Sequence, residues 1–179
     1  MKKIIALTIV ALMTSGVALA QHGHGNCGNC PHHQQHQQHA RMQQAAPAGD
    51  SFEQAMAKAF PQMKSTKKEG KLTAVCDTKG KVIGYAVSSK PASDGIKGYN
   101  GETPVMIAFD AKKKITGVYL LANMETPKFV QHVQQAGFFS QWNGLSVKKA
   151  LKKKVDTVSG ATFTSSAVIK SVHAVLETL

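Results

Sequence analysis

Several familiar features are missing from this chain of 179 residues. Its three cysteines include a single Cys-x-x-Cys, so a structural zinc site built from two such pairs is excluded. No Gly-x-Gly-x-x-Gly follows an expected strand, which removes the usual dinucleotide-binding fingerprint. No Ser/His/Asp set and no pair of catalytic carboxylates can be assigned either. The sequence therefore gives no sign of a standalone acid–base enzyme.

The hydrophobic run near the start of the chain favours a signal peptide over the alternative, a membrane anchor. The longest apolar stretch near the start, Ile4 to Met13, is well short of the roughly 20 residues that cross a bilayer. It follows Lys2 and Lys3 and precedes the small-x-small pattern Ala18-Leu19-Ala20. These features are typical of a secretory signal peptide over residues 1–20. No cysteine stands at the cleavage point, so we expect a periplasmic or otherwise extracytoplasmic protein, soluble after signal-peptide cleavage, and not a lipoprotein.

Acidic residues are also few. Ten Asp and Glu against 22 Lys and Arg give a formal net charge of +12. Short lysine runs carry much of this charge: Lys67-Lys68, Lys112 to Lys114, Lys148-Lys149 and Lys152 to Lys154. These runs could form patches that bind an acidic redox partner or an anionic membrane surface. The alternative is that they belong to several unrelated faces exposed to solvent. Nucleic acid is not expected as a partner of an exported protein.

Residues 21–50 differ in composition from the rest of the chain. They contain six of the eight histidines, many glutamines and almost no aliphatic side chains, so we expect a disordered segment. Thiolate and imidazole groups bind soft or borderline metals such as Zn, Cu or Ni. Other interpretations are equally possible: the Cys-x-x-Cys can form a disulfide or a redox pair, and a His/Gln-rich tail can simply be solvated. The candidate metal ligands are His22, His24, Cys27, Cys30, His32, His33, His36 and His39.

Residues 51–179 have the composition of one globular domain. About 130 residues suffice for a core that buries about two-thirds of the unfolded surface. A helical stripe at 51–63 is interrupted by Pro61, and a helix is expected from Pro127 to Gln135. Two hairpins are expected, 71–76 with 82–88 and 105–109 with 115–121. The sequence thus predicts an α+β fold, a single domain of antiparallel hairpins packed against a few helices, preceded by the signal peptide and the His-rich tail.

A last helix is expected near the C-terminus, where apolar residues recur at spacings of three and four. These residues are Val168, Val172, Val175, Leu176 and Leu179. His132 and His173 each stand alone on an expected helix. We expect them to be surface or capping groups and not metal ligands.

The most informative segment is 155–166, Val-Asp-Thr-Val-Ser-Gly-Ala-Thr-Phe-Thr-Ser-Ser, which places hydroxyls and a glycine just before that helix. A helix start has unpaired N–H groups and a partial positive charge, so a phosphate bound there gains hydrogen bonds and a dipole interaction. Gly160 allows the backbone to come close. The alternative is that Ser159, Thr162 or Thr164 simply caps the helix.

Asp156-x-x-Ser-Gly-Ala-Thr-x-Thr-Ser resembles the attachment motif of the FMN-binding domain family. That family includes the covalent-flavin subunits of ion-translocating NADH:quinone and ferredoxin:NAD oxidoreductases and many small exported flavoproteins. The resemblance covers roughly residues 70–179, because a second set of motifs occurs in the right order. This sequence departs from the family pattern at one place. Many family members have glycines after Glu-Thr-Pro, whereas this chain has Lys128-Phe129-Val130. The second set comprises Gly98 to Pro104, the run to Phe109, Lys114 to Val118, and Glu125-Thr126-Pro127.

The resemblance implies a covalent FMN, joined through a phosphoester to Thr162 by a separate flavin transferase that uses FAD and a divalent cation. It also implies further cofactor-binding residues. Ser159 and Thr164, with the N–H groups of Gly160 and Ala161, would hold the phosphate. Asp156 would orient the loop or assist the transfer, and Glu125 and Thr126 would lie over the flavin. Three further aromatic residues could flank the flavin ring: Phe138, Phe139 and Trp142. The alternative is that they pack in the core, and we expect this of at least two of the three.

The expected function is that of an electron carrier between extracytoplasmic or membrane redox proteins, more than that of a standalone enzyme. Two alternatives stay open. In one, the tail makes this a metal-binding or metal-handling exported protein. In the other, the domain is a flavin-dependent reductase with its own small-molecule substrate.

Overall fold

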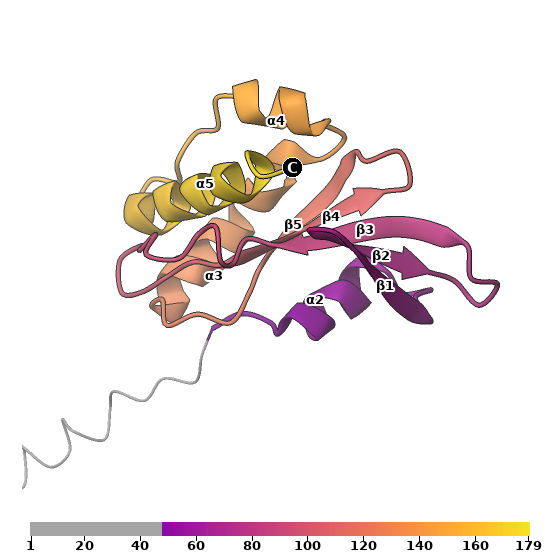
Figure 1. Cartoon of the computed structure of the whole chain (residues 1–179). Coiled ribbons are helices and arrows are strands. Elements are labelled where there is room, and N and C mark those ends of the chain that lie inside the picture. The colour runs from indigo at the N-terminus through magenta and orange to yellow at the C-terminus, as the bar shows by residue number, and fades with distance from the viewer. Residues whose placement is uncertain (1–47) are drawn as a thin grey trace, which may run out of the picture. The chain divides into compact units, whose positions relative to one another are not determined.

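The structure is a computed structural model that describes residues 48–179. The signal peptide and the eight candidate metal ligands expected from the sequence lie outside the described residues. The described part contains a five-stranded antiparallel sheet in the order β1-β2-β3-β4-β5, with helices on both faces (Figure 1). This arrangement confirms the α+β fold. The strands are β1 (Ser65–Glu69), β2 (Leu72–Cys76), β3 (Val82–Ser88), β4 (Val105–Asp110) and β5 (Ile115–Leu120).

Each strand pairs with the next one in the sequence, so the sheet is a meander. Four strands agree with the two predicted hairpins. The fifth, β1, was not predicted, because Ser-Thr-Lys-Lys-Glu has no apolar alternation and all five side chains are exposed. It is an edge strand, and its lysines protect that edge from pairing with another chain.

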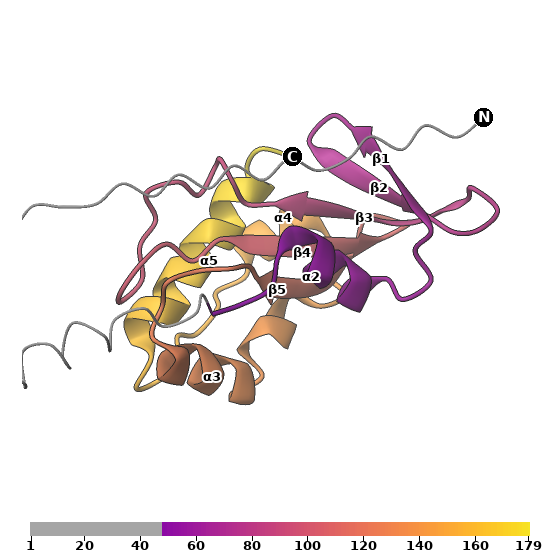
Figure 2. The same ribbon diagram turned by 90° about the horizontal axis from the view of Figure 1, so that it is seen from below.

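The inner strand β4, which lies between β3 and β5, has a buried side chain on each face of the sheet in turn. Val105, Ile107 and Phe109 belong to one hydrophobic cluster, whereas Met106 and Ala108 belong to the other. This alternation follows from the two-residue period of a strand. The smaller cluster is closed by α2 (Phe52–Ala59), which packs on β4 and β5 (Figure 2). A capping box formed by Ser51 and Gln54 begins that helix.

The larger cluster lies under the remaining helices, with α4 and α5 above the sheet in Figure 1. The predicted α3 is present with its expected bounds, whereas the short α4 was not predicted. Phe138 and Trp142 are buried and meet edge to face, with ring centroids 5.4 Å apart, so they belong to the core. The elements are α3 (Pro127–Gln135), η1 (Phe138–Trp142), α4 (Val147–Lys152) and α5 (Thr162–Leu176).

The last helix buries Val168, Val172, Val175 and Leu176 as the spacing predicts, but Leu179 lies beyond its end and is 45% exposed. No helix among residues 48–179 is long and apolar enough to cross a membrane.

The folded part begins before residue 51, the boundary expected from composition. Ala48 forms a bridge with Asn123, and Asp50 forms one with Leu121. The Ala48 carbonyl accepts hydrogen bonds from the Asn123 backbone N–H at 2.8 Å and from its side-chain amide at 2.7 Å. Residues 48–50 are therefore part of the domain, a fact that their Ala-Gly-Asp composition does not indicate.

Candidate functional site

Thr162 is the first residue of α5, and its side chain is exposed. The residue before it, Ala161, provides no side-chain hydrogen bond to the helix, so none of the nearby hydroxyls acts as the cap that the sequence left open. The first N–H groups of a helix without a cap are available to a ligand. A fifteen-residue helix therefore presents its positive end beside an exposed hydroxyl, an arrangement suited to a phosphate.

The loop before Thr162 is shaped from inside by Ser165. This buried hydroxyl accepts a hydrogen bond from the Val158 N–H at 3.0 Å and donates to the Ala161 carbonyl at 2.9 Å. Between these two residues Gly160 has a φ of +78°, a left-handed conformation that glycine adopts without steric cost. The Ser-Gly-Ala-Thr segment thus has one defined shape, fixed by a side chain of the helix that it precedes.

His132 holds the same loop from outside. Its Nε2 lies 2.9 Å from the Ser159 carbonyl oxygen, which can only accept, so Nε2 carries the hydrogen. A Cβ built on Gly160 would be 3.6 Å from the same nitrogen, so the ring packs directly against the glycine. The sequence predicts only a surface or capping histidine here. The contact spans 27 residues, and no local pattern indicates it.

Glu125 is a buried carboxylate beneath the site, with an exposed fraction of 2%. One oxygen accepts the N–H groups of Asn100 at 2.8 Å and Gly101 at 3.0 Å. The other accepts the hydroxyl of Thr164 at 2.7 Å. The carboxylate therefore joins the turn at 98–101 to the first turn of α5, and the two sequence motifs meet through it.

Gly98 is required by this arrangement. A Cβ at that position would lie 2.6 Å from a Glu125 carboxylate oxygen, closer than real Cβ contacts. The glycine therefore lets the backbone pass directly over the carboxylate. Gly98 and Glu125 are in direct contact in the structure although they are far apart in the sequence.

Exposed aromatic side chains surround Thr162. Tyr99 is 62% exposed and Phe163 is 72% exposed, values that are unusual for such large apolar groups. Tyr99 packs edge to face on Phe129, with ring centroids 4.9 Å apart. Together with residues 160–164 these three rings line a hollow of about 100 Å³. Phe129 is half-buried and supports the exposed Tyr99 from one side.

The remaining site residues predicted from the sequence have different positions. Asp156 and Ser159 are exposed, and within residues 48–179 nothing hydrogen-bonds to the Asp156 carboxylate. Thr126 precedes α3 without a side-chain capping bond. The Thr164 hydroxyl is buried on Glu125, so it is not free to hold a phosphate. Phe139, half-buried, packs on Phe138 in the core cluster.

An ion pair ties down the loop that carries Tyr99. Glu102 accepts the Gly95 N–H at 2.9 Å and lies 3.0 Å from the Lys90 ammonium. The Gly95 hydrogen bond, and then Lys90, lower the pKa of Glu102, and Glu102 in turn raises the pKa of Lys90. Both groups are therefore charged at neutral pH. Among the described residues no group of three or more His, Cys, Asp or Glu side chains is placed to bind a metal.

The site fits FMN on two counts: an uncapped helix start beside an exposed hydroxyl suits its phosphate, and exposed aromatic rings suit its planar ring system. A comparison with protein families supports the same assignment, since the FMN-binding domain matches residues 98–177. That match runs from the glycine above Glu125 through α5 and includes both motifs. No curated protein matches the chain. Residues 98–177 of this chain therefore match the FMN-binding domain family, a match that supports FMN as the cofactor of this protein.

Proposed function

We propose that this protein is exported, carries FMN covalently through a phosphoester on Thr162, and passes electrons between extracytoplasmic redox partners. The observation that carries the proposal is the position of Thr162, an exposed hydroxyl at the first residue of a fifteen-residue helix without a side-chain cap. The signal-peptide pattern of residues 1–20 supports the extracytoplasmic location.

Attachment uses the Thr162 hydroxyl as a nucleophile. Its Oγ1 forms a bond to the phosphorus on the flavin side of FAD, the diphosphate bond breaks, AMP leaves, and the hydroxyl proton passes to a base. A separate flavin transferase supplies that base and a divalent cation. In this structure Oγ1 is 3.5 Å from the Val158 carbonyl, beyond the usual range for an O–H···O bond, so the hydroxyl is almost free to react.

Asp156 is available to assist the transfer. Its carboxylate is exposed and, within residues 48–179, has no hydrogen-bond partner, so it does not serve to fix the turn before α5. Exposed carboxylates are ligands for hard divalent cations. The phosphate itself would be held by the exposed Ser159 hydroxyl and by the N–H groups of Gly160 and the α5 start, since Thr164 is committed to Glu125.

The shape of the site favours an electron carrier over a reductase. Bound FMN supplies one-electron and two-electron chemistry. The hollow of about 100 Å³ beside Thr162 is well below the range of about 300–1,000 Å³ for enclosed small-molecule sites. Tyr99 and Phe163 therefore support the flavin ring system at the protein surface. A ring system in that position is open to contact with a redox protein, whereas it does not enclose an organic substrate.

Attachment is tested by intact mass. The protein is expressed with its N-terminal segment in a host with and without a flavin transferase. We expect a mass gain of one FMN less one water only with the transferase, and peptide mapping should place it on the fragment that contains Thr162. A gain that maps elsewhere, or no gain with an active transferase, contradicts the proposal.

A further inference from the structure

We propose that the buried carboxylate of Glu125 lowers the reduction potential of the flavin by placing a negative charge beneath its binding site. The inference rests on the proposed function, in which FMN is held beside Thr162, and it adds a residue that tunes the bound cofactor. Glu125 is not among the described residues that line the hollow beside Thr162. It therefore acts through its electric field and not as a ligand of the ring.

The carboxylate lies one hydrogen bond beneath the wall of the hollow. Thr164 lines the hollow together with Tyr99 and Thr162. The Thr164 hydroxyl also donates to Glu125 Oε2 at 2.7 Å. One side chain therefore separates the charge from the space beside Thr162.

The hydrogen bonds to Glu125 stabilise its ionised form. The N–H groups of Asn100 and Gly101 donate to one oxygen, and the Thr164 hydroxyl donates to the other. Neutral donors of this kind favour a charged carboxylate without cancelling its charge. Within residues 48–179 no basic side chain forms an ion pair with it. A net negative charge therefore remains on a side chain that is only 2% exposed.

Burial gives this charge a longer reach than that of the surface lysines. The interaction between two charges is several times stronger in the protein interior than in water, whereas dissolved salt screens exposed charges beyond about 10 Å. Lys97 and Lys128, the lysines closest in sequence to Tyr99 and Phe129, are exposed. Their effect at the site is therefore weaker than that of Glu125.

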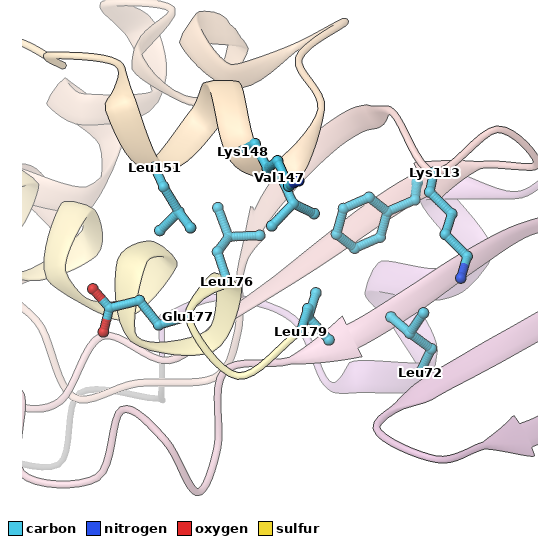
Figure 3. A pocket seen from close by; sticks show the side chains of 9 residues that line it. Leu72, Lys113, Val147, Lys148, Leu151, Leu176, Glu177 and Leu179 are labelled. Carbon is cyan, nitrogen blue, oxygen red and sulfur yellow. The ribbon is translucent and has the colours of Figure 1, made fainter.

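A second group of charged side chains lies too far away to compensate Glu125. Figure 3 shows this group around the apolar cavity at the C-terminal end of α5, where Lys113, Lys148 and Glu177 meet. Leu176, beside them, is fourteen positions after Thr162 on the same helix, which corresponds to about 21 Å. That distance exceeds the screening length at physiological salt. These groups therefore do not offset the field of Glu125 at Thr162.

A negative charge beside the flavin opposes its reduction. Full reduction of bound FMN takes two electrons from a donor and up to two protons from the solvent. Electron charge that no proton compensates is repelled by the Glu125 carboxylate. Removal of this carboxylate charge should therefore raise the reduction potential.

The test is a spectroelectrochemical titration of the FMN-loaded protein at neutral pH. Glu125→Gln removes the charge and keeps the shape, because the amide oxygen can accept the N–H groups of Asn100 and Gly101 while the amide nitrogen donates to Thr164. We expect the equilibrium constant for two-electron reduction to rise at least about tenfold, a positive shift of about 30 mV. A potential that stays the same or falls overturns the proposal.

Two further variants separate the charge from the structure. Glu125→Asp keeps the charge but is one methylene shorter, so it disturbs the hydrogen bonds and should leave the potential closer to that of the unchanged protein. Glu102→Gln is the matched control, since this partly exposed carboxylate already lies 3.0 Å from the Lys90 ammonium and should shift the potential less. A rise in either variant equal to that of Glu125→Gln overturns the proposal.

Covalent loading is measured separately, by fluorescence on a denaturing gel. If no FMN is attached, the linkage proposed for Thr162 is wrong, and the titration is run on the same proteins with added FMN. The rise in Glu125→Gln is expected there as well, because the field of the carboxylate does not depend on the phosphoester. Failure of the attachment and failure of the electrostatic role are therefore distinguished.

Discussion

The hydroxyl of Thr164 donates a 2.7 Å hydrogen bond to the buried carboxylate of Glu125, 39 positions earlier in the chain. Through this bond the first turn of α5 is joined to the turn at 98–101, because the other Glu125 oxygen accepts two N–H groups there. Thr162 and the exposed Tyr99 are therefore placed relative to each other by a group that lies beneath both of them.

Replacing Glu125 should damage both stability and the site. Glu125→Ala leaves two N–H groups and one hydroxyl without their buried acceptor, so we expect the free energy of unfolding to fall by about 3 kcal/mol. Urea denaturation followed by circular dichroism measures this change. Glu69→Ala, at an exposed position of β1, is the control and should stay within about 0.5 kcal/mol of the unchanged protein. Equal effects of the two substitutions would show that the buried bonds do not stabilise the fold.

Thr162→Ala should abolish covalent flavin without destabilising the protein. Thr162 provides no cap to α5, so its removal should change the unfolding free energy by less than about 0.5 kcal/mol. Thr162→Ser keeps a hydroxyl and should retain some attachment, and Thr157→Ala, at an exposed threonine five positions earlier, should be flavinylated normally. Fluorescence of the band on a denaturing gel is the measurement. A fluorescent band from the alanine variant would move the linkage to another residue.

His132 should affect the rate of attachment more than the stability of the fold. The histidine is exposed and holds the Ser159 carbonyl by one hydrogen bond, which contributes about 1 kcal/mol. His132→Phe should therefore slow FMN incorporation by purified transferase and FAD by up to about tenfold. His132→Gln, which keeps a donor, should restore part of the rate. The exposed Gln135→Ala on the same helix is the control. An unchanged rate in His132→Phe would show that the loop keeps its shape without this contact.

The sequence predicts those parts of the molecule that depend on local order. Hairpin turns, the proline at the start of α3 and the apolar spacing of α5 are short-range patterns, and the corresponding elements are present. The edge strand β1 has no periodic signal, because all five of its side chains are exposed. Helix α4 buries Ala150 and packs Val147 and Leu151 against the core, but six residues are too few for this apolar spacing to indicate a helix.

At the site, the motif predicts Thr162 as the attachment residue but does not predict the residues that hold its loop in place. The resemblance places Glu125 over the flavin, and no sequence pattern indicates that its buried carboxylate also accepts the Thr164 hydroxyl. His132 has no motif at all, and its partner Ser159 lies 27 residues away. Contacts of this kind depend on how α3 and α5 pack, which a single sequence without neighbours in space does not specify.

Removal of the N-terminal tail should have different effects according to where the cut is made. A protein lacking residues 21–44 should fold and receive FMN normally. A protein lacking residues 21–49 also loses the Ala48 carbonyl that accepts two bonds from Asn123, so it should be less stable by about 1–3 kcal/mol. Thermal unfolding and denaturing-gel fluorescence compare the two. Equal stability would show that the strand pairing at Ala48 contributes nothing.

The same pair of proteins tests the metal-handling alternative. Binding of Zn²⁺, Cu²⁺ or Ni²⁺ should be lost with residues 21–44, because every candidate ligand of the tail lies there. If the shortened protein still binds these metals with the original stoichiometry, the tail is not the metal site. If removal of the tail abolishes electron transfer while FMN stays attached, the tail takes part in the redox function.

Electron exchange with a protein partner should weaken as salt rises. The whole chain carries a formal net charge of +12, which becomes +10 when the expected signal peptide with Lys2 and Lys3 is removed, and screening shortens the reach of the attraction that such a charge exerts on an acidic partner. Lys128 is exposed at the start of α3, next to the Phe129 that supports Tyr99, so Lys128→Glu should lower the bimolecular rate at low salt. Lys67→Glu on the edge strand β1 is the matched control and should change it less. Stopped-flow oxidation of the reduced flavoprotein across a salt series provides both measurements. A bimolecular rate that does not change with ionic strength would show that the lysines do not guide docking. Repeated turnover of a small organic substrate by the protein alone would favour the flavin-dependent reductase over the electron carrier, because a carrier with a shallow, open site is not expected to convert such a substrate.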